Sequence, residues 1–182
     1  MVNLAQEIGV IQDRAARSLS YYCTEDIVGI DDGIVEQLLQ VSTKNDYCDA
    51  RICLHSGPDD SFHEAIILQY RKHYYRPHIH PNKGESCHII RGQLCFFVFN
   101  DDGTVADKRV VGESDSVMYR AGVDRWHTVI PVTDFVVYHE SKPGPYLRNR
   151  DSVFPHWAPD SLDPKESRRY MDHLLALAED GK

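Results

Sequence analysis

The stretch between Asp49 and Lys142 constrains the fold of this chain more than any other feature. It consists of short apolar or alternating runs, each separated from the next by residues typical of turns. The runs read ARICLH, HEAIILQY, ESCHII, QLCFFVF, RVV, SVMY, HTVI and DFVVYHE. About eight short strands at this spacing favour a sandwich or a barrel over a parallel sheet. Since QLCFFVF is apolar on both faces, we expect it at the centre of a sheet that is covered on both sides.

Three segments outside this stretch carry apolar residues at helical spacing. They are residues 3–19, residues 32–43 with Asp31 or Asp32 as the N-cap, and residues 164–179 with Asp163 as the cap. Residues 143–164 are rich in proline and show no periodicity. We therefore expect one domain in three parts: a helical segment at 1–45, a β-barrel at 46–145, and a proline-rich tail with a C-terminal helix at 146–182.

The composition excludes several classes of protein. The chain has 182 residues, 42% of them hydrophobic, which supplies enough apolar material for a core and argues against disorder. A net charge of −8 argues against a nucleic-acid binder that relies on phosphate contacts. There is no apolar run of about 18 residues and no signal-peptide pattern, so we expect neither a membrane span nor secretion. Five cysteines without a CxxC pair favour free, buried thiols in a cytoplasmic protein.

Histidine is concentrated in one part of the sequence. Four of the 10 histidines lie between residues 73 and 88. His78 and His80 are two positions apart, so on an extended strand both side chains point to the same face. Glu85 follows a short turn, after which an antiparallel strand can present its carboxylate to the same interior. Two imidazoles and a carboxylate are suitable ligands for divalent Fe, Mn, Co, Ni or Zn.

A fourth protein ligand would complete such a site, and His127 is the best candidate. It begins a new β run directly after a turn that contains glycine. The pattern thus predicts a metal site formed by His78, His80, Glu85 and His127, with one or two coordination positions open. The alternative is that these histidines only form hydrogen bonds at the rim or in the core of the barrel. His88 lies on the opposite strand face from Glu85, and we interpret it as structural.

The run PHIHPNKGESCHIIRG, residues 77–92, matches the first metal-binding motif of cupins. Together with AGVDRWHTV, the PGPY at 143–146 and the WAP at 157–159, it resembles the WbuC family of cupin-fold metalloproteins over about residues 50–160. The resemblance implies a mainly β fold, the double-stranded β-helix or cupin jelly-roll barrel, with a bound divalent metal ion. It also implies a setting in O-antigen or lipopolysaccharide biosynthesis, without specifying a reaction.

The general cupin pattern is only partly present. Lys72 stands where the first motif has its opening glycine, Arg120 replaces a proline of the second motif, and Pro131 occupies its final asparagine position. The interpretation of His127 as a ligand therefore rests on its place in the sequence and on the resemblance to the WbuC family.

Three further residues are candidates for substrate binding or catalysis. Arg76 can bind an anionic substrate through its bidentate guanidinium, although a surface role is equally consistent with its position. Tyr70 is a candidate catalytic hydroxyl beside Glu85, or else a core aromatic. Trp126 can cover the metal or stack on a sugar, and core packing is the alternative.

These observations leave more than one function open. The first hypothesis is a metal-dependent enzyme, an isomerase, an epimerase or an oxygenase, acting on a small polar substrate such as a sugar or sugar nucleotide. The second is a non-catalytic small-molecule-binding or sensor protein, and the third is a closed structural metal site. We expect a homodimer and a small-molecule partner, with no nucleic acid and no membrane among its partners.

Overall fold

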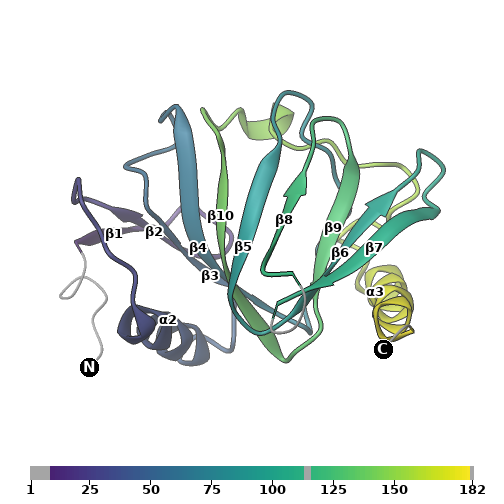
Figure 1. Cartoon of the computed structure of the whole chain (residues 1–182), viewed down its shortest axis with the longest axis horizontal. Coiled ribbons are helices and arrows are strands. Elements are labelled where there is room, and N and C mark those ends of the chain that lie inside the picture. Colours follow the sequence, from purple (N-terminus) through teal and green to yellow (C-terminus); the bar gives the residue numbers. More distant parts are fainter. Residues whose placement is uncertain (1–8, 113–115, 181–182) are drawn as a thin grey trace.

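The structure is a computed structural model that describes residues 9–112 and 116–180. Its strands are β1 (Val10–Asp13), β2 (Leu19–Cys23), β3 (Ala50–Cys53), β4 (Phe62–Tyr70), β5 (Glu85–Arg91), β6 (Leu94–Phe99), β7 (Val105–Val111), β8 (Met118–Ala121), β9 (Trp126–Pro131) and β10 (Phe135–Pro143). The helices are α2 (Asp32–Thr43), the short 3-10 helix η1 (Arg148–Arg150) and α3 (Pro164–Glu179). Figure 1 shows the strands between the two longer helices, α2 beside β3 and α3 beside β7.

Two sheets form the body of the molecule. The larger has seven strands in the order β1-β2-β3-β4-β10-β5-β8, and the smaller has three in the order β7-β6-β9. Their inner faces pack on one another through a buried cluster drawn from both sheets, which includes Cys87, Leu94, Phe96, Val129 and Tyr138. Most neighbouring strands are antiparallel, and four of the eight described pairs, β4–β10, β10–β5, β5–β8 and β6–β9, join strands that are not consecutive in sequence. This arrangement is the double-stranded β-helix, or cupin jelly-roll barrel, and it confirms the predicted fold class.

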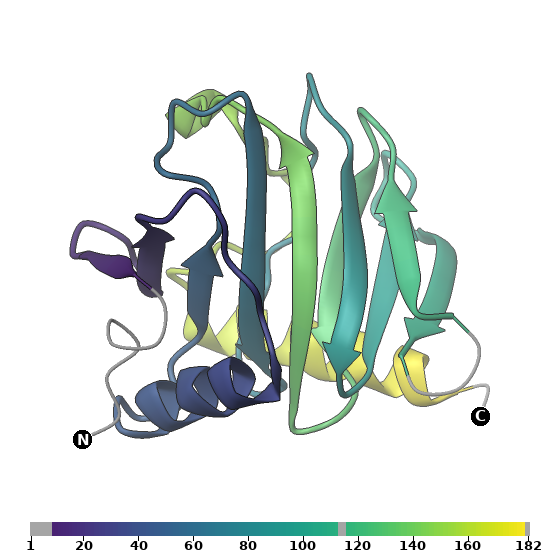
Figure 2. The same cartoon turned by 60° about the vertical axis from the view of Figure 1, so that its left-hand side comes forward.

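The helix expected at 32–43 is present as α2. Asp31 is its N-cap, and the Asp31 carboxylate accepts a hydrogen bond from the Ile34 backbone amide at 3.0 Å. Buried residues of α2, Leu38 among them, pack against Ile52 and Leu68 on the outer face of the larger sheet. Figure 2 shows α2 beside the part of that sheet that the smaller sheet does not cover.

The helix expected at 164–179 is also present, as α3. Pro164 lies in its first turn and the Asp163 carboxylate accepts from the Glu166 amide, as the sequence predicts. Leu174 packs against Phe97 on the outer face of the smaller sheet. Since Phe96 belongs to the cluster between the sheets, β6 is covered on both sides, as expected from its apolar sequence.

The prediction of a helix at residues 3–19 is wrong for residues 9–19, which the structure describes. Residues 1–8 lie outside the described residues, and β1 and β2 form a hairpin over Val10 to Cys23. β2 pairs in parallel with β3, so the edge of the sheet supplies the hydrogen bonds that a helix would have made internally. Between the strands, the Asp13 carboxylate accepts from the Ala15 amide at 2.9 Å and stabilises a turn.

The five cysteines are all free, and Cys48 is the one that is not buried. This agrees with the thiols expected from the sequence. No helix among residues 9–112 and 116–180 is long and apolar enough to cross a membrane.

Candidate metal centre

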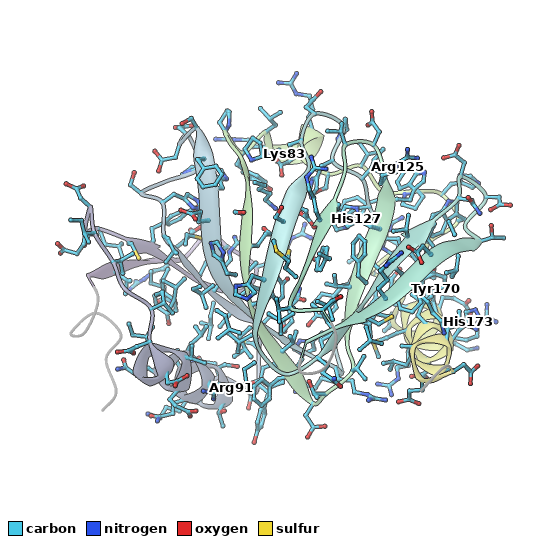
Figure 3. The ribbon with its side chains drawn as sticks, viewed as in Figure 1. Lys83, Arg91, Arg125, His127, Tyr170 and His173 are labelled. Atoms are coloured by element: carbon cyan, nitrogen blue, oxygen red, sulfur yellow. The ribbon has the colours of Figure 1, made fainter. Side chains whose placement is uncertain are left out.

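The four predicted ligands come together at one end of the barrel. His78 lies just before β5 in the chain and pairs with His127 of β9 through two backbone hydrogen bonds of 3.0 and 2.9 Å. His80 follows on the same extended segment, and Glu85 is the first residue of β5. The three imidazoles each place a nitrogen within 4.8 Å of the others. Figure 3 shows the labelled His127 and Lys83 at the end of the strands opposite to Arg91.

Glu85 lies between two of these imidazoles. Glu85 Oε1 is 3.2 Å from His127 Nε2, and Glu85 Oε2 is 3.2 Å from His80 Nε2. Glu85, His80 and His127 are buried, with relative exposures of 6%, 4% and 2%. Side chains so rich in nitrogen and oxygen are rarely buried together unless each finds a partner.

The second nitrogen of each ring is held by the backbone. Nδ1 of His78 contacts the Arg76 carbonyl oxygen at 3.0 Å, and Nδ1 of His127 contacts the Arg125 carbonyl oxygen at 2.7 Å. Nδ1 of His80 contacts the Asp151 carbonyl oxygen at 2.6 Å. Because a carbonyl oxygen can only accept, each Nδ1 carries the proton, and in the neutral ring Nε2 presents its lone pair. This is the arrangement that holds metal-binding histidines in one orientation.

The electrostatics of the cluster favour a cation. Burial and the neighbouring His127 lower the pKa of His78 to about 3, so His78 is neutral at physiological pH. Burial raises the pKa of Glu85, but the contacts with His127 and His80 and the nearby Lys142 charge together outweigh this effect and hold the pKa well below its usual value. Burial lowers the pKa of His127, but the hydrogen bond with Glu85, the charge of Glu85 and the Arg125 carbonyl together outweigh burial and raise it, so a bound metal ion would displace the proton between His127 Nε2 and Glu85. A neutral imidazole and an ionised carboxylate are the protonation states that bind metals.

One atom of the cluster has no hydrogen bond. His80 Nε2 is buried, and although Glu85 Oε2 is 3.2 Å away, no group among the described residues forms a hydrogen bond with it. A buried nitrogen without a partner costs about 1–3 kcal/mol, and a metal ion would remove that cost. The residues present therefore fit a divalent cation held by His78, His80, Glu85 and His127.

A cavity of about 340 Å³ opens beside this cluster. The residues that line it, besides the four candidate ligands, include Gln69, Arg76, Tyr138, Glu140, Lys142 and Phe154. A space of this size holds a small molecule.

Lys83 and Asp151 brace the cluster from outside the cavity. Lys83 lies in the turn between His80 and Glu85, and Lys83 Nζ is 2.5 Å from Asp151 Oδ1 in a buried ion pair. The Asp151 carbonyl oxygen also accepts from His80 Nδ1. One residue thus fixes both the ring of His80 and the turn that leads to Glu85. No sequence pattern indicates this pair, because its members lie 68 positions apart.

Arg76 lines the cavity, as a substrate-binding residue should. Arg76 Nη1 donates to Asp160 Oδ2 at 2.8 Å, and the guanidinium carbon lies 5.1 Å from the centre of the Phe154 ring. This places the residue at the edge of the cavity, with part of its charge compensated by Asp160.

The structure does not bring Tyr70 or Trp126 to the cavity. The Tyr70 hydroxyl is 3.0 Å from Ser42 Oγ, and its ring belongs to the cluster beneath α2. Tyr70 is the last residue of β4, so its side chain points to the outer face, and the predicted catalytic role is wrong. Trp126 donates from Nε1 to Asp101 and packs against Trp157, which supports the packing alternative over a role at the metal. His88 is exposed on the outer face of β5, as expected.

The chain is similar to proteins of known and unknown function. Residues 30–111 match a family described as a domain of unknown function, DUF6016, and no curated protein matches the chain. Among solved structures, the capsular polysaccharide assembling protein CapF from Staphylococcus aureus is similar, with a TM-score of 0.49 and 14% identity over 59% of this chain and 30% of that chain. Oxalate decarboxylase from Bacillus subtilis gives a TM-score of 0.46 and 11% identity, over 59% of this chain and 27% of that chain.

The regions matched in these solved structures make up less than a third of each protein. A similarity of this extent gives no information about the activity of this chain. The jelly-roll fold of this chain follows from its own strand order and inner core.

Proposed function

We propose that this protein is a metal-dependent cupin enzyme that binds one divalent cation through His78, His80, Glu85 and His127. The observation that carries the proposal is the backbone anchoring of all three rings, each of which places a ligand nitrogen within 4.8 Å of the other two. Fe, Mn, Zn, Ni and Co all fit this ligand set. When bound, the ion supplies Lewis-acid chemistry at a carbonyl or hydroxyl group, or activates a bound water.

The cavity supports an open site over a purely structural one. A closed structural site needs no free volume, whereas this cluster borders a space of about 340 Å³ lined by polar side chains. The substrate that we propose is small and polar, of the sugar or sugar-nucleotide kind. The reaction would be an isomerisation, an epimerisation or an oxygenation. The runner-up function is a non-catalytic sensor that binds the same class of ligand in the same cavity.

The biological setting is proposed from the resemblance to the WbuC family. The block at residues 77–92 and the short tail motifs support a cytoplasmic role in lipopolysaccharide or O-antigen biosynthesis. We also expect a homodimer, which light scattering would detect as twice the chain mass of 20.9 kDa. A monomeric mass at micromolar concentration would contradict the dimer and leave the metal centre unaffected.

Metal content is the direct test of the proposed centre. Purified wild-type protein, loaded with Mn²⁺, Zn²⁺ or Co²⁺ and then freed of unbound ion, is expected to retain about one equivalent per chain. The double variant His78→Ala/His80→Ala is expected to retain close to none, because it loses two of the four ligands. Elemental analysis gives both values.

His88→Ala is the matched control for this experiment. It removes an imidazole from the same region of sequence, but from the exposed outer face of β5. The control should therefore retain one equivalent. Equal metal content in the wild type and the double variant would refute the proposed centre.

A further inference from the structure

A lysine and a glutamate lie beside the four candidate ligands of the metal centre. Lys142 and Glu140 both come from β10 and line the cavity. Lys142 Nζ is 2.8 Å from Glu140 Oε1 and 3.9 Å from Glu85 Oε2. Because Glu85 is itself a candidate ligand, a molecule bound at the open side of the metal lies within reach of the Lys142 ammonium. The Lys142 ammonium can donate three hydrogen bonds, and the Glu140 carboxylate accepts one of them.

The charges around the cavity do not cancel once a metal is bound. A divalent ion and Lys142 contribute three positive charges, against two carboxylates, Glu85 and Glu140. The guanidinium of Arg76 is already paired with Asp160. The three imidazoles are neutral when they bind a metal. One positive charge is therefore left over in a largely buried space, where an uncompensated charge is costly.

Two further polar atoms at the cavity are without partners. Gln69 Oε1, a hydrogen-bond acceptor, and Arg76 Nε, a donor, are both buried and form no hydrogen bond within the described parts of the chain. Both residues line the cavity. Buried atoms of this kind usually have a partner, so a ligand that offers both a donor and an acceptor would satisfy them.

We propose that the cavity binds a small organic monoanion that carries a hydroxyl group beside its carboxylate, with Lys142 as the residue that selects the negative charge. The carboxylate neutralises the remaining positive charge, and the hydroxyl supplies the donor that Gln69 Oε1 lacks. This inference rests on the proposed metal centre and changes the proposed substrate from a neutral sugar or a sugar nucleotide to a hydroxy acid, such as a sugar acid. A sugar nucleotide would bring more negative charge than the cavity compensates, and a neutral sugar would leave the charge of Lys142 uncompensated.

The inference can be tested with cobalt-loaded protein, whose absorption bands respond to a ligand on the metal. Glycolate is the probe, glycolamide is its neutral counterpart of the same size, and imidazole is a neutral ligand for the metal alone. Lys142→Met is expected to weaken glycolate binding at least about tenfold, since it removes a charge-assisted hydrogen bond to the glycolate carboxylate. Its affinities for glycolamide and imidazole should stay close to the wild-type values.

Two variants make the result specific. Lys44→Met removes the same charge from the exposed end of α2 and should leave every affinity unchanged. Glu140→Gln removes a negative charge from the cavity and frees Lys142, so glycolate should bind more tightly than to the wild type. A purely structural role of the pair would weaken binding in both cavity variants.

The failures of this inference and of the metal centre are distinguishable. If one equivalent of cobalt binds but Lys142→Met and Lys44→Met bind glycolate equally well, the ligand class is wrong and the metal centre stands. Wild-type protein that binds glycolamide as tightly as glycolate leads to the same conclusion. If the wild type retains no cobalt, the metal centre is wrong, and the inference falls with it.

Discussion

Replacing Asp151 with alanine is expected to lower the free energy of unfolding by about 3–5 kcal/mol, the usual cost of leaving one partner of a buried ion pair alone. Lys83 and Asp151 are each about 5% exposed, and Lys83 Nζ would keep the Pro145 carbonyl oxygen at 3.2 Å, which carries no full charge. The variant also removes the acceptor of the Leu147 amide. Urea denaturation of the metal-free protein measures the change.

The pH dependence of this loss has a definite sign. Burial raises the pKa of Asp151, but the hydrogen bond and charge of Lys83 and the hydrogen bond from the Leu147 amide together outweigh burial, and the pKa lies below its usual value. The stabilisation from Asp151 is therefore complete above the ordinary carboxyl pKa of about 4 and disappears as the pH falls through the lowered value. The difference between the wild type and Asp151→Ala should shrink in acid.

The double variant Lys83→Met/Asp151→Leu is the matched control. It removes both charges and fills the same space with apolar side chains, a change that is often close to neutral. Its stability should lie clearly above that of Asp151→Ala. If Asp151→Ala loses less than about 1 kcal/mol, the pair is not a buried brace of the cluster.

The sequence is sufficient to predict a sandwich or a barrel because its strands are marked locally, and the resemblance to the WbuC family adds the jelly roll. Turn residues separate the apolar runs. Strand β6, which is packed on both sides, carries apolar residues on both of its faces. The hairpin of β1 and β2 cannot be found in this way. Apolar spacing along Val10 to Leu19 also fits a helix, and what decides against one is the free edge of β3, a partner about 30 residues away.

Part of the candidate site can be predicted from the sequence in the same way, and part of it cannot. His78, His80 and Glu85 lie within one strand–turn–strand unit, so their spacing alone indicates that they converge. The roles of Lys142 and Asp151 cannot be predicted from the sequence because they depend on contacts between distant segments. The prediction for Tyr70 fails because the parity of β4, which decides the face of the sheet, is set by its pairing with β10 and by the packing of α2.

Saturation with a divalent cation is expected to raise the free energy of unfolding by about 4 kcal/mol when the free ion exceeds its dissociation constant about a thousandfold. The reason is that the four ligands are brought together only by the fold: His78 and His80 on one segment, Glu85 on β5 and His127 on β9. For a chain of this length, each kcal/mol corresponds to roughly 2–4 °C in the melting temperature. Thermal melts with and without metal give the shift, and a chelator should reverse it.

His127→Ala is the decisive comparison, because it keeps the local pair of histidines and removes the ligand from the distant strand. A cation that binds only to His78 and His80 would bind them in the unfolded chain as well, and such binding stabilises nothing. The variant should therefore lose most of the metal-induced shift, whereas His88→Ala should retain all of it. An equal shift in His127→Ala and the wild type would mean that β9 takes no part in the centre, and that its backbone pairing with His78 is structural alone.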